Sequence, residues 1–298
     1  MSEILELLEL ISRLLHAEDV LLLCHKNPDG DTIGSAAALQ HALKNLGKNA
    51  AVLCADPIPA RYGYMQLEPY TGQFTPGYVV AVDIAGIQLF GDALQPYVER
   101  VDLCIDHHSS NAGYADAMYL DGGAAATAEI IYELLRAMNA EITPLIADCL
   151  YTGLSTDTGC FLYSNTTAHT HTVAAALMEA GARVVMISHQ TAAAVDGGQP
   201  ATLSYRIVTE LLRGELGFEG VAVTDALRMD AVAGTYGSGE ACVRALLAGC
   251  DMLLLPKNFS NGYHGVLEAV TDGRLSEERI DESVRRILKL KDAWGLLK

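Results

Sequence analysis

Four short segments of the sequence concentrate side chains that bind hard metal ions. They supply carboxylates and imidazoles, a set that suits Mn²⁺ or Mg²⁺, although affinity order alone would favour Zn²⁺. Several carboxylates in one crevice would repel one another, and two divalent cations would relieve that repulsion. The candidate residues, in chain order, are His25, Asp29, Asp31, Asp83, Asp106, His107, His108 and Asp157.

The predicted strands bring these segments to one edge of a sheet. Apolar runs at 20–24, 78–82 and 103–105 come directly before the first three segments, and we expect the fourth, around Asp157, to join them at strand ends. In an open α/β sheet the carboxyl ends of the strands line one crevice. A single Asp in such a place is more often a helix cap, and one His pair is more often structural. Four segments in order favour a shared metal site.

Strands and helices alternate through the first part of the chain. Apolar spacing predicts a helix over 3–15 with Ser2 as its N-cap, and small residues predict a helix over about 33–46 that stops at Gly47. A further strand is expected at 50–54, and further helices at about 125–138, 144–154 and 168–180. This alternation predicts an α/β fold with a doubly wound parallel sheet.

Strands and helices continue to alternate after residue 183, but the sequence motifs differ from those of the first part. Strands are expected at 184–188, 220–224 and 252–255, and helices at about 204–215, 238–249, 260–271 and 276–293. We therefore expect two domains, 1–183 and 184–298, with the boundary inferred from motif content.

The first four motifs resemble those of the DHH phosphoesterase superfamily. They read HKNPDGDTIGSAAAL, VAVD, CIDHHSSN and GLSTDTGCFLYSNTT. The resemblance covers about residues 15–182 and is nearest to the bifunctional oligoribonuclease and phosphoadenosine-phosphate phosphatase branch. It implies one Mn²⁺ (or Mg²⁺) held by His25, Asp29 and Asp83, and a second held by Asp31, Asp83, His107 and Asp157. Asp83 would bridge the two ions, His108 would act beside the scissile phosphate, and Asp106 would orient the histidines.

The chemistry implied is hydrolysis of a phosphoester by a water held between two metal ions roughly 3.5–4 Å apart. Gly34 and Ser35 would let a phosphate approach the start of their helix closely. Two features depart from the family. Leu89 stands where a basic residue is usual, and no glycine-rich substrate-binding signature is visible after residue 183. A domain that binds metal but turns over little substrate is therefore an alternative.

The second part resembles the last three strand–helix units of a glycoside hydrolase family 3 barrel. The sharpest matches are PATLS at 200–204 and VTD at 223–225, and the family nucleophile maps to Asp225. A fragment of a β-N-acetylhexosaminidase is thus a second alternative. Sugar hydrolysis needs an acid/base partner, and the upstream KHFPGHG-like loop that would provide it is missing. Three strands also cannot close a barrel. The choices are an extended sheet with the first domain, a separate α/β layer or pairing with a second chain, and we favour a separate layer with a dimer edge.

Composition restricts the kinds of substrate that the chain is expected to bind. The chain has a net charge of −17, and residues 1–183 carry 8 Lys and Arg against 22 Asp and Glu. Such a surface repels long nucleic acid, so the expected substrate is a small phosphorylated molecule or a very short oligonucleotide. No apolar run is long enough to span a membrane, the N-terminus does not read as a signal peptide, and the seven cysteines show no CxxC pair. We expect a cytoplasmic protein.

Overall fold

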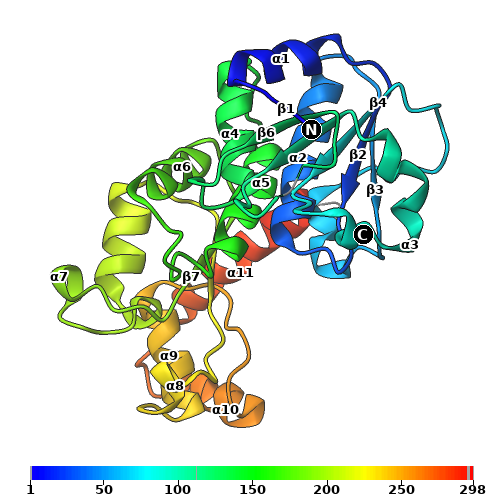
Figure 1. Cartoon of the computed structure of the whole chain (residues 1–298). Helices are drawn as coiled ribbons and strands as arrows, with labels where there is room; N and C mark the ends of the chain where they lie inside the picture. Colours follow the sequence, from blue (N-terminus) through cyan, green and yellow to red (C-terminus); the bar gives the residue numbers. More distant parts are fainter. Residues whose placement is uncertain (1, 112, 294–295, 298) are drawn as a thin grey trace. The chain divides into compact units, whose positions relative to one another are not determined.

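The computed structural model of the chain describes residues 2–111, 113–293 and 296–297. It divides into two compact units, residues 1–180 and 181–298 (Figure 1). None of the described helices is both long and apolar enough to cross a bilayer.

Unit 1 is built on a six-stranded sheet in which every neighbouring pair is parallel. Its strand order is β1-β6-β5-β4-β2-β3. The chain moves outward from β2 to β3 and then returns to the other side of β2 to form β4, so the strand order reverses between β2 and β4. In such sheets the crevice at this reversal is where ligands bind. The strands are β1 (Glu3–Ile4), β2 (Val20–Cys24), β3 (Ala50–Cys54), β4 (Tyr78–Val82), β5 (Leu103–Asp106) and β6 (Ala117–Leu120).

The central strands are nearly continuous apolar runs because both faces of the sheet are covered. On one face Leu21 and Leu23 of β2 pack with Phe90 and with Leu94 of α3 (Gly91–Leu94). On the other face α2 (Gly30–Asn45) and α4 (Thr127–Ala137) contact the sheet, and α5 (Pro144–Asp157) packs on both of these helices. The remaining elements of unit 1 are α1 (Leu7–His16), α6 (Ala168–Glu179), η1 (Ala60–Met65), η2 (Ile87–Leu89) and η3 (Gln95–Arg100).

Helices α2 and α5 cross at very short range because two glycines lie at their contact. A Cβ atom added to Gly34 of α2 would lie 2.4 Å from the carbonyl oxygen of Cys149 in α5. A Cβ added to Gly153 of α5 would lie 2.8 Å from Asp31 Oδ1. Gly34 therefore serves helix packing, and our expectation that it admits a phosphate is wrong.

Unit 2 contains a separate two-stranded parallel sheet of β7 (Val184–Ile187) and β8 (Val221–Thr224). Its buried Asp251 carboxylate accepts from Arg213 at 2.6 Å, from Ser283 at 2.8 Å and Arg286 at 3.0 Å of the last helix, and from the Ala222 N–H of β8 at 3.0 Å, which ties that helix to the sheet. The helices are α7 (Ala193–Asp196), η4 (Ala201–Leu203), the π-helix η5 (Arg206–Glu215), α8 (Asp230–Ala233), α9 (Ser238–Ala248), α10 (Phe259–Thr271) and α11 (Glu277–Ala293).

The α/β class and the parallel sheet are as expected, but four local predictions are wrong. The first helix begins at Leu7 with Glu6 as its N-cap, because residues 3–4 pair with β6 instead. Helix α2 begins at Gly30, three residues early, since Asp29 caps it. The segment 252–255 forms only a bridge from Met252 to Val223, because Leu254 N–H bonds the Thr224 hydroxyl in place of a ladder partner. Asp157 ends helix α5 and not a strand.

Candidate metal centre

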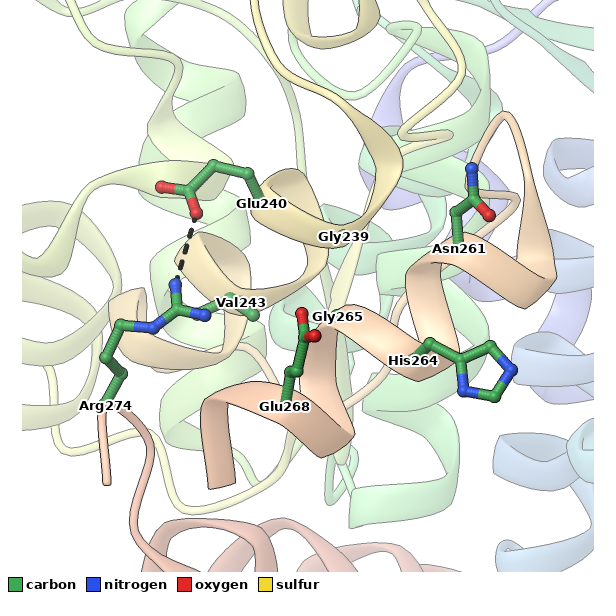
Figure 2. A pocket seen from close by; sticks show the side chains of 8 residues that line it. All are labelled: Gly239, Glu240, Val243, Asn261, His264, Gly265, Glu268 and Arg274. Carbon is green, nitrogen blue, oxygen red and sulfur yellow. Dashed lines mark ion pairs between the residues drawn. The ribbon is translucent and has the colours of Figure 1, made fainter. Parts of the chain in front are cut away.

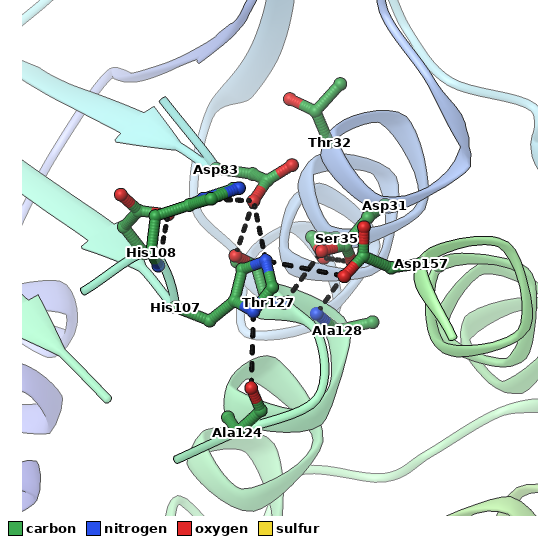
Figure 3. Close-up of polar contacts among 12 residues, drawn as sticks. Asp31, Thr32, Ser35, Asp83, His107, His108, Ala124, Thr127, Ala128 and Asp157 are labelled. Carbon is green, nitrogen blue, oxygen red and sulfur yellow. Dashed lines mark hydrogen bonds and ion pairs between the residues drawn. The ribbon is translucent and has the colours of Figure 1, made fainter. Parts of the chain in front are cut away.

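The expected ligands converge where the carboxyl ends of the central strands meet helices α2 and α5 (Figure 3). Their ligand atoms form three overlapping groups, and within each group all atoms lie within 4.8 Å of one another. The first group is His25, Asp29 and Asp83; the second is Asp83, His107 and His108; the third is Asp31, His107 and Asp157. One expected set of three ligands thus lies together, and the other set is spread over two groups that share His107.

Asp83 lies between the groups and turns a different oxygen toward each side. Its Oδ2 is 3.6 Å from His25 Nε2, and its Oδ1 is 3.8 Å from His107 Nε2. The residue is buried and its backbone has a φ of 61°, in the left-handed region that only a few per cent of non-glycine residues adopt. Strained residues of this kind cluster at functional sites.

The two histidines present the same nitrogen to the centre. Nδ1 of His25 donates to the carbonyl of Lys26 at 2.8 Å, and Nδ1 of His107 donates to the carbonyl of Ala124 at 3.2 Å. A carbonyl can only accept, so both Nδ1 atoms carry the proton and Nε2 is left to bind a metal. Among the described residues, nothing hydrogen-bonds the buried Nε2 of His107. Asp157 Oδ2 is 3.5 Å from that Nε2, so the donors present fit a cation between them.

Crowded carboxylates shift the proton affinities of the site. The pKa of Asp31 is raised well above its usual value by burial and by the charges of Asp83 and Asp157. Burial lowers the pKa of His25, but the nearby carboxylates of Asp29 and Asp83 outweigh it and raise that pKa to about 10. Protons therefore supply the positive charge that cations would otherwise provide.

His108 and Asp106 form a pair beside these ligands. Asp106 is fully buried and accepts from His108 Nδ1 at 2.8 Å, while Asn111 donates to its other oxygen at 2.7 Å. The hydrogen bond to Asp106 is the main reason that the pKa of His108 is raised. The side chain of His108 is 41% exposed, so its Nε2 can reach a substrate.

Sequence reasoning missed one segment that hydrogen-bonds three of the proposed metal ligands. Residues 124–128 hold no carboxylate or imidazole, yet Thr127 Oγ1 donates to Asp83 Oδ1 at 2.8 Å and the Ala128 backbone N–H donates to Asp31 Oδ1 at 2.9 Å (Figure 3). The only sequence signal was a predicted helix start close to this point.

Asp225 of unit 2 lacks the surroundings of a sugar-cleaving carboxylate. Its Oδ1 accepts from the backbone N–H of Ala226 at 2.6 Å. The buried His189 lies close by, but its Nε2 donates to the carbonyl of Ala226 at 3.0 Å and its Nδ1 is 2.8 Å from the Thr202 hydroxyl. Both ring nitrogens are engaged, so His189 is not placed to exchange a proton with a substrate.

A hollow of unit 2, about 340 Å³ in volume, lies between α9 and α10 (Figure 2). The backbones of Gly239 and Gly265 meet at its base, and Glu240 lies 3.6 Å from Arg274 at its rim. No group of three potential metal ligands was found there among the described residues. It offers neither a metal site nor a buried acid.

Comparison with known proteins finds two families in the chain. The DHH family N-terminal domain matches residues 19–154, and the glycosyl hydrolase family 3 N-terminal domain matches residues 166–290. Both resemblances are therefore confirmed: the chain is a hybrid of a DHH-like segment and a glycosyl hydrolase family 3-like segment. The second match begins ahead of the expected boundary at residue 184.

Individual relatives belong to one or the other of these two kinds of protein. The bifunctional oligoribonuclease and PAP phosphatase NrnA of Thermus thermophilus is 33% identical over 190 residues, covering 61% of this chain and 57% of that protein. A beta-N-acetylglucosaminidase/beta-glucosidase of Cellulomonas fimi is 33% identical over 131 residues, covering 41% of this chain and 23% of that protein. The chain thus spans just over half of the first relative and under a quarter of the second.

One solved structure shares the fold. The exopolyphosphatase-related protein from Bacteroides fragilis superposes with a TM-score of 0.53 at 18% identity, covering 82% of this chain and 64% of that one. At this identity the likeness concerns the fold alone.

Proposed function

We propose that this chain hydrolyses phosphoesters at a centre for two Mn²⁺ or Mg²⁺ ions. The observation that carries the proposal is the placement of Asp83, whose two oxygens turn to different ligand groups. One ion is assigned to His25, Asp29 and Asp83, and the other to Asp31, Asp83, His107 and Asp157. When bound, such ions lower the pKa of a water and stabilise charge on the phosphoryl oxygens.

The protein's own side chains orient the reaction. The Nδ1 bonds of His25 and His107 fix both rings with Nε2 toward the centre. Asp106 holds His108 by its Nδ1, so the exposed Nε2 keeps a proton for the leaving oxygen or for the charge that develops on the phosphate. His108 is therefore the catalytic residue we propose, and Asp106 is its positioning residue.

The proposed substrates are small phosphates such as phosphoadenosine phosphate, or very short oligoribonucleotides. The names of the NrnA relatives support this class, and the acidity of residues 1–183 disfavours a long RNA. We assign the activity to residues 1–183 and give residues 184–298 no catalytic role. The compartment that we propose for this activity is the cytoplasm.

Metal analysis of the Asp83→Ala variant tests the proposal. The wild-type protein should bind two Mn²⁺ ions per chain and cleave a chromogenic phosphodiester only when Mn²⁺ is present. Asp83→Ala should lose both ions and the cleavage, because Asp83 is the one residue that we assign to both ions. Asp116→Ala removes an exposed carboxylate at the amino end of β6 and should change neither. Two ions retained by Asp83→Ala would rule out the bridge, and a wild-type protein without metal would rule out the function.

A further inference from the structure

The segment 124–128, which we call the cradle, connects the ligands through the first turn of α4. Helix α4 begins at Thr127, and its N-cap residue, Ala126, has no side chain that could bond the free N–H groups. Asp31 of α2 takes that place: its Oδ2 accepts from the Thr127 N–H at 2.7 Å and its Oδ1 from the Ala128 N–H at 2.9 Å. The start of α4 thereby fixes both oxygens of a proposed metal ligand.

The cradle reaches two more ligands through its carbonyl groups. Ala124 O accepts from His107 Nδ1 at 3.2 Å and so sets the tautomer of that ring. Ala125 O accepts from Asn165 Nδ2 at 2.8 Å, and the same amide donates to the carbonyl of Asp157 at 3.2 Å. One short stretch of chain therefore contacts Asp31 and His107 directly and Asp157 through one side chain.

The side chain of Thr127 adds the contact to Asp83. It is fully buried, and its single hydroxyl proton is donated to Asp83 Oδ1 at 2.8 Å. This is the hydrogen bond that orients the Asp83 carboxylate, whose backbone lies in the left-handed region. A β-branched side chain such as Thr has few rotamers, which makes its hydroxyl a rigid donor. Without that donor, the carboxylate of Asp83 is free to rotate away from the arrangement in which each oxygen faces one group.

We infer that Thr127 is a positioning residue that holds the bridging carboxylate of Asp83 in register with the Asp31 carboxylate bound by the same helix turn. The inference rests on the proposed metal centre and concerns a residue outside its ligands. It predicts that the Thr127 hydroxyl contributes to metal binding even though it contacts no metal.

Calorimetric titration of the metal-free protein with Mn²⁺ tests the inference without any substrate. Thr127→Val keeps the branched shape and removes the donor, and it should weaken Mn²⁺ binding about tenfold to a hundredfold, as loss of a partner behind a metal ligand commonly does. Thr127→Ser keeps the hydroxyl and should restore most of the affinity. Thr202→Val makes the same substitution at another fully buried hydroxyl, in unit 2, and should bind Mn²⁺ as the wild type does.

The outcomes separate this inference from the proposed function. Wild-type affinity in Thr127→Val, measured on protein whose circular dichroism shows it to be folded, would overturn the inference and leave the metal centre intact. Equal weakening in the Val and Ser variants would also overturn it, because the hydroxyl would then not be the cause. A wild-type protein that binds no Mn²⁺ would overturn the metal centre and this inference together.

Discussion

Replacing Gly34 by alanine tests how helix packing holds the two carboxylates of the third ligand group together. The added Cβ would lie 2.4 Å from the carbonyl oxygen of Cys149, where ordinary contact begins at 3.4 Å. Helices α2 and α5 must therefore separate locally by about 1 Å, a strain of the kind that costs about 1–3 kcal/mol in well-packed cores. The obstacle is backbone and cannot rotate aside, so the upper part of that range applies.

Alanine also favours a helix over glycine by about 0.5–1 kcal/mol, which leaves a net loss of about 2 kcal/mol in the free energy of unfolding of unit 1. Asp31 lies on α2 and Asp157 on α5. The separation should therefore also weaken Mn²⁺ binding, by about tenfold. Urea unfolding followed by circular dichroism measures the first effect, and calorimetry measures the second.

Gly63→Ala is the matched control for this substitution. A Cβ at Gly63 meets no atom within 4 Å, and its φ is not positive, so alanine should be neutral or stabilising by about 0.4–1 kcal/mol. Equal stability of the two variants, together with unchanged Mn²⁺ affinity in Gly34→Ala, would show that the close helix crossing does not set the site.

Three further predictions concern pH, sugars and RNA. In the absence of metal, the raised pKa of His25 adds stability that is fully present below its ordinary value of 6.5 and is lost as pH rises through about 10. The midpoint of thermal unfolding, measured in EDTA, should therefore fall across that window. An unchanged pH dependence of that midpoint in His25→Gln would contradict the assignment. Asp225→Asn should leave Mn²⁺-dependent phosphodiester cleavage unchanged, and the wild type should release no nitrophenol from a nitrophenyl N-acetylglucosaminide; release by the wild type that the variant loses would revive the sugar hydrolase. A twenty-nucleotide RNA should bind weakly at physiological salt, since residues 1–183 hold only 8 basic residues; tight binding in a filter assay would count against the short-substrate proposal.

The sequence alone determined the central strands of unit 1 and the candidate ligands. β2, β3 and β4 lie where their apolar runs predict, because strands buried on both faces leave a continuous signal. The candidate ligands could be identified because metal binding restricts ligands to a few residue types. Asp83 and His107 each follow a strand, and this predicted that they would lie close together. The hybrid character was also legible, since each part carries its own motifs.

Only the tertiary structure decided what surrounds those ligands. β6 and the two-residue β1 were not predicted, because such short strands owe their pairing to neighbours and not to a local pattern. The sequence around Gly34 did not predict its contact with Cys149 of α5, since a close helix crossing depends on which backbone lies opposite. Thr127 looked like an ordinary residue at a helix start, and its role rests on contacts to Asp31 and Asp83, which lie 96 and 44 residues away in sequence. Interactions over such separations leave no periodic trace in one sequence, so they appear only when the chain is folded.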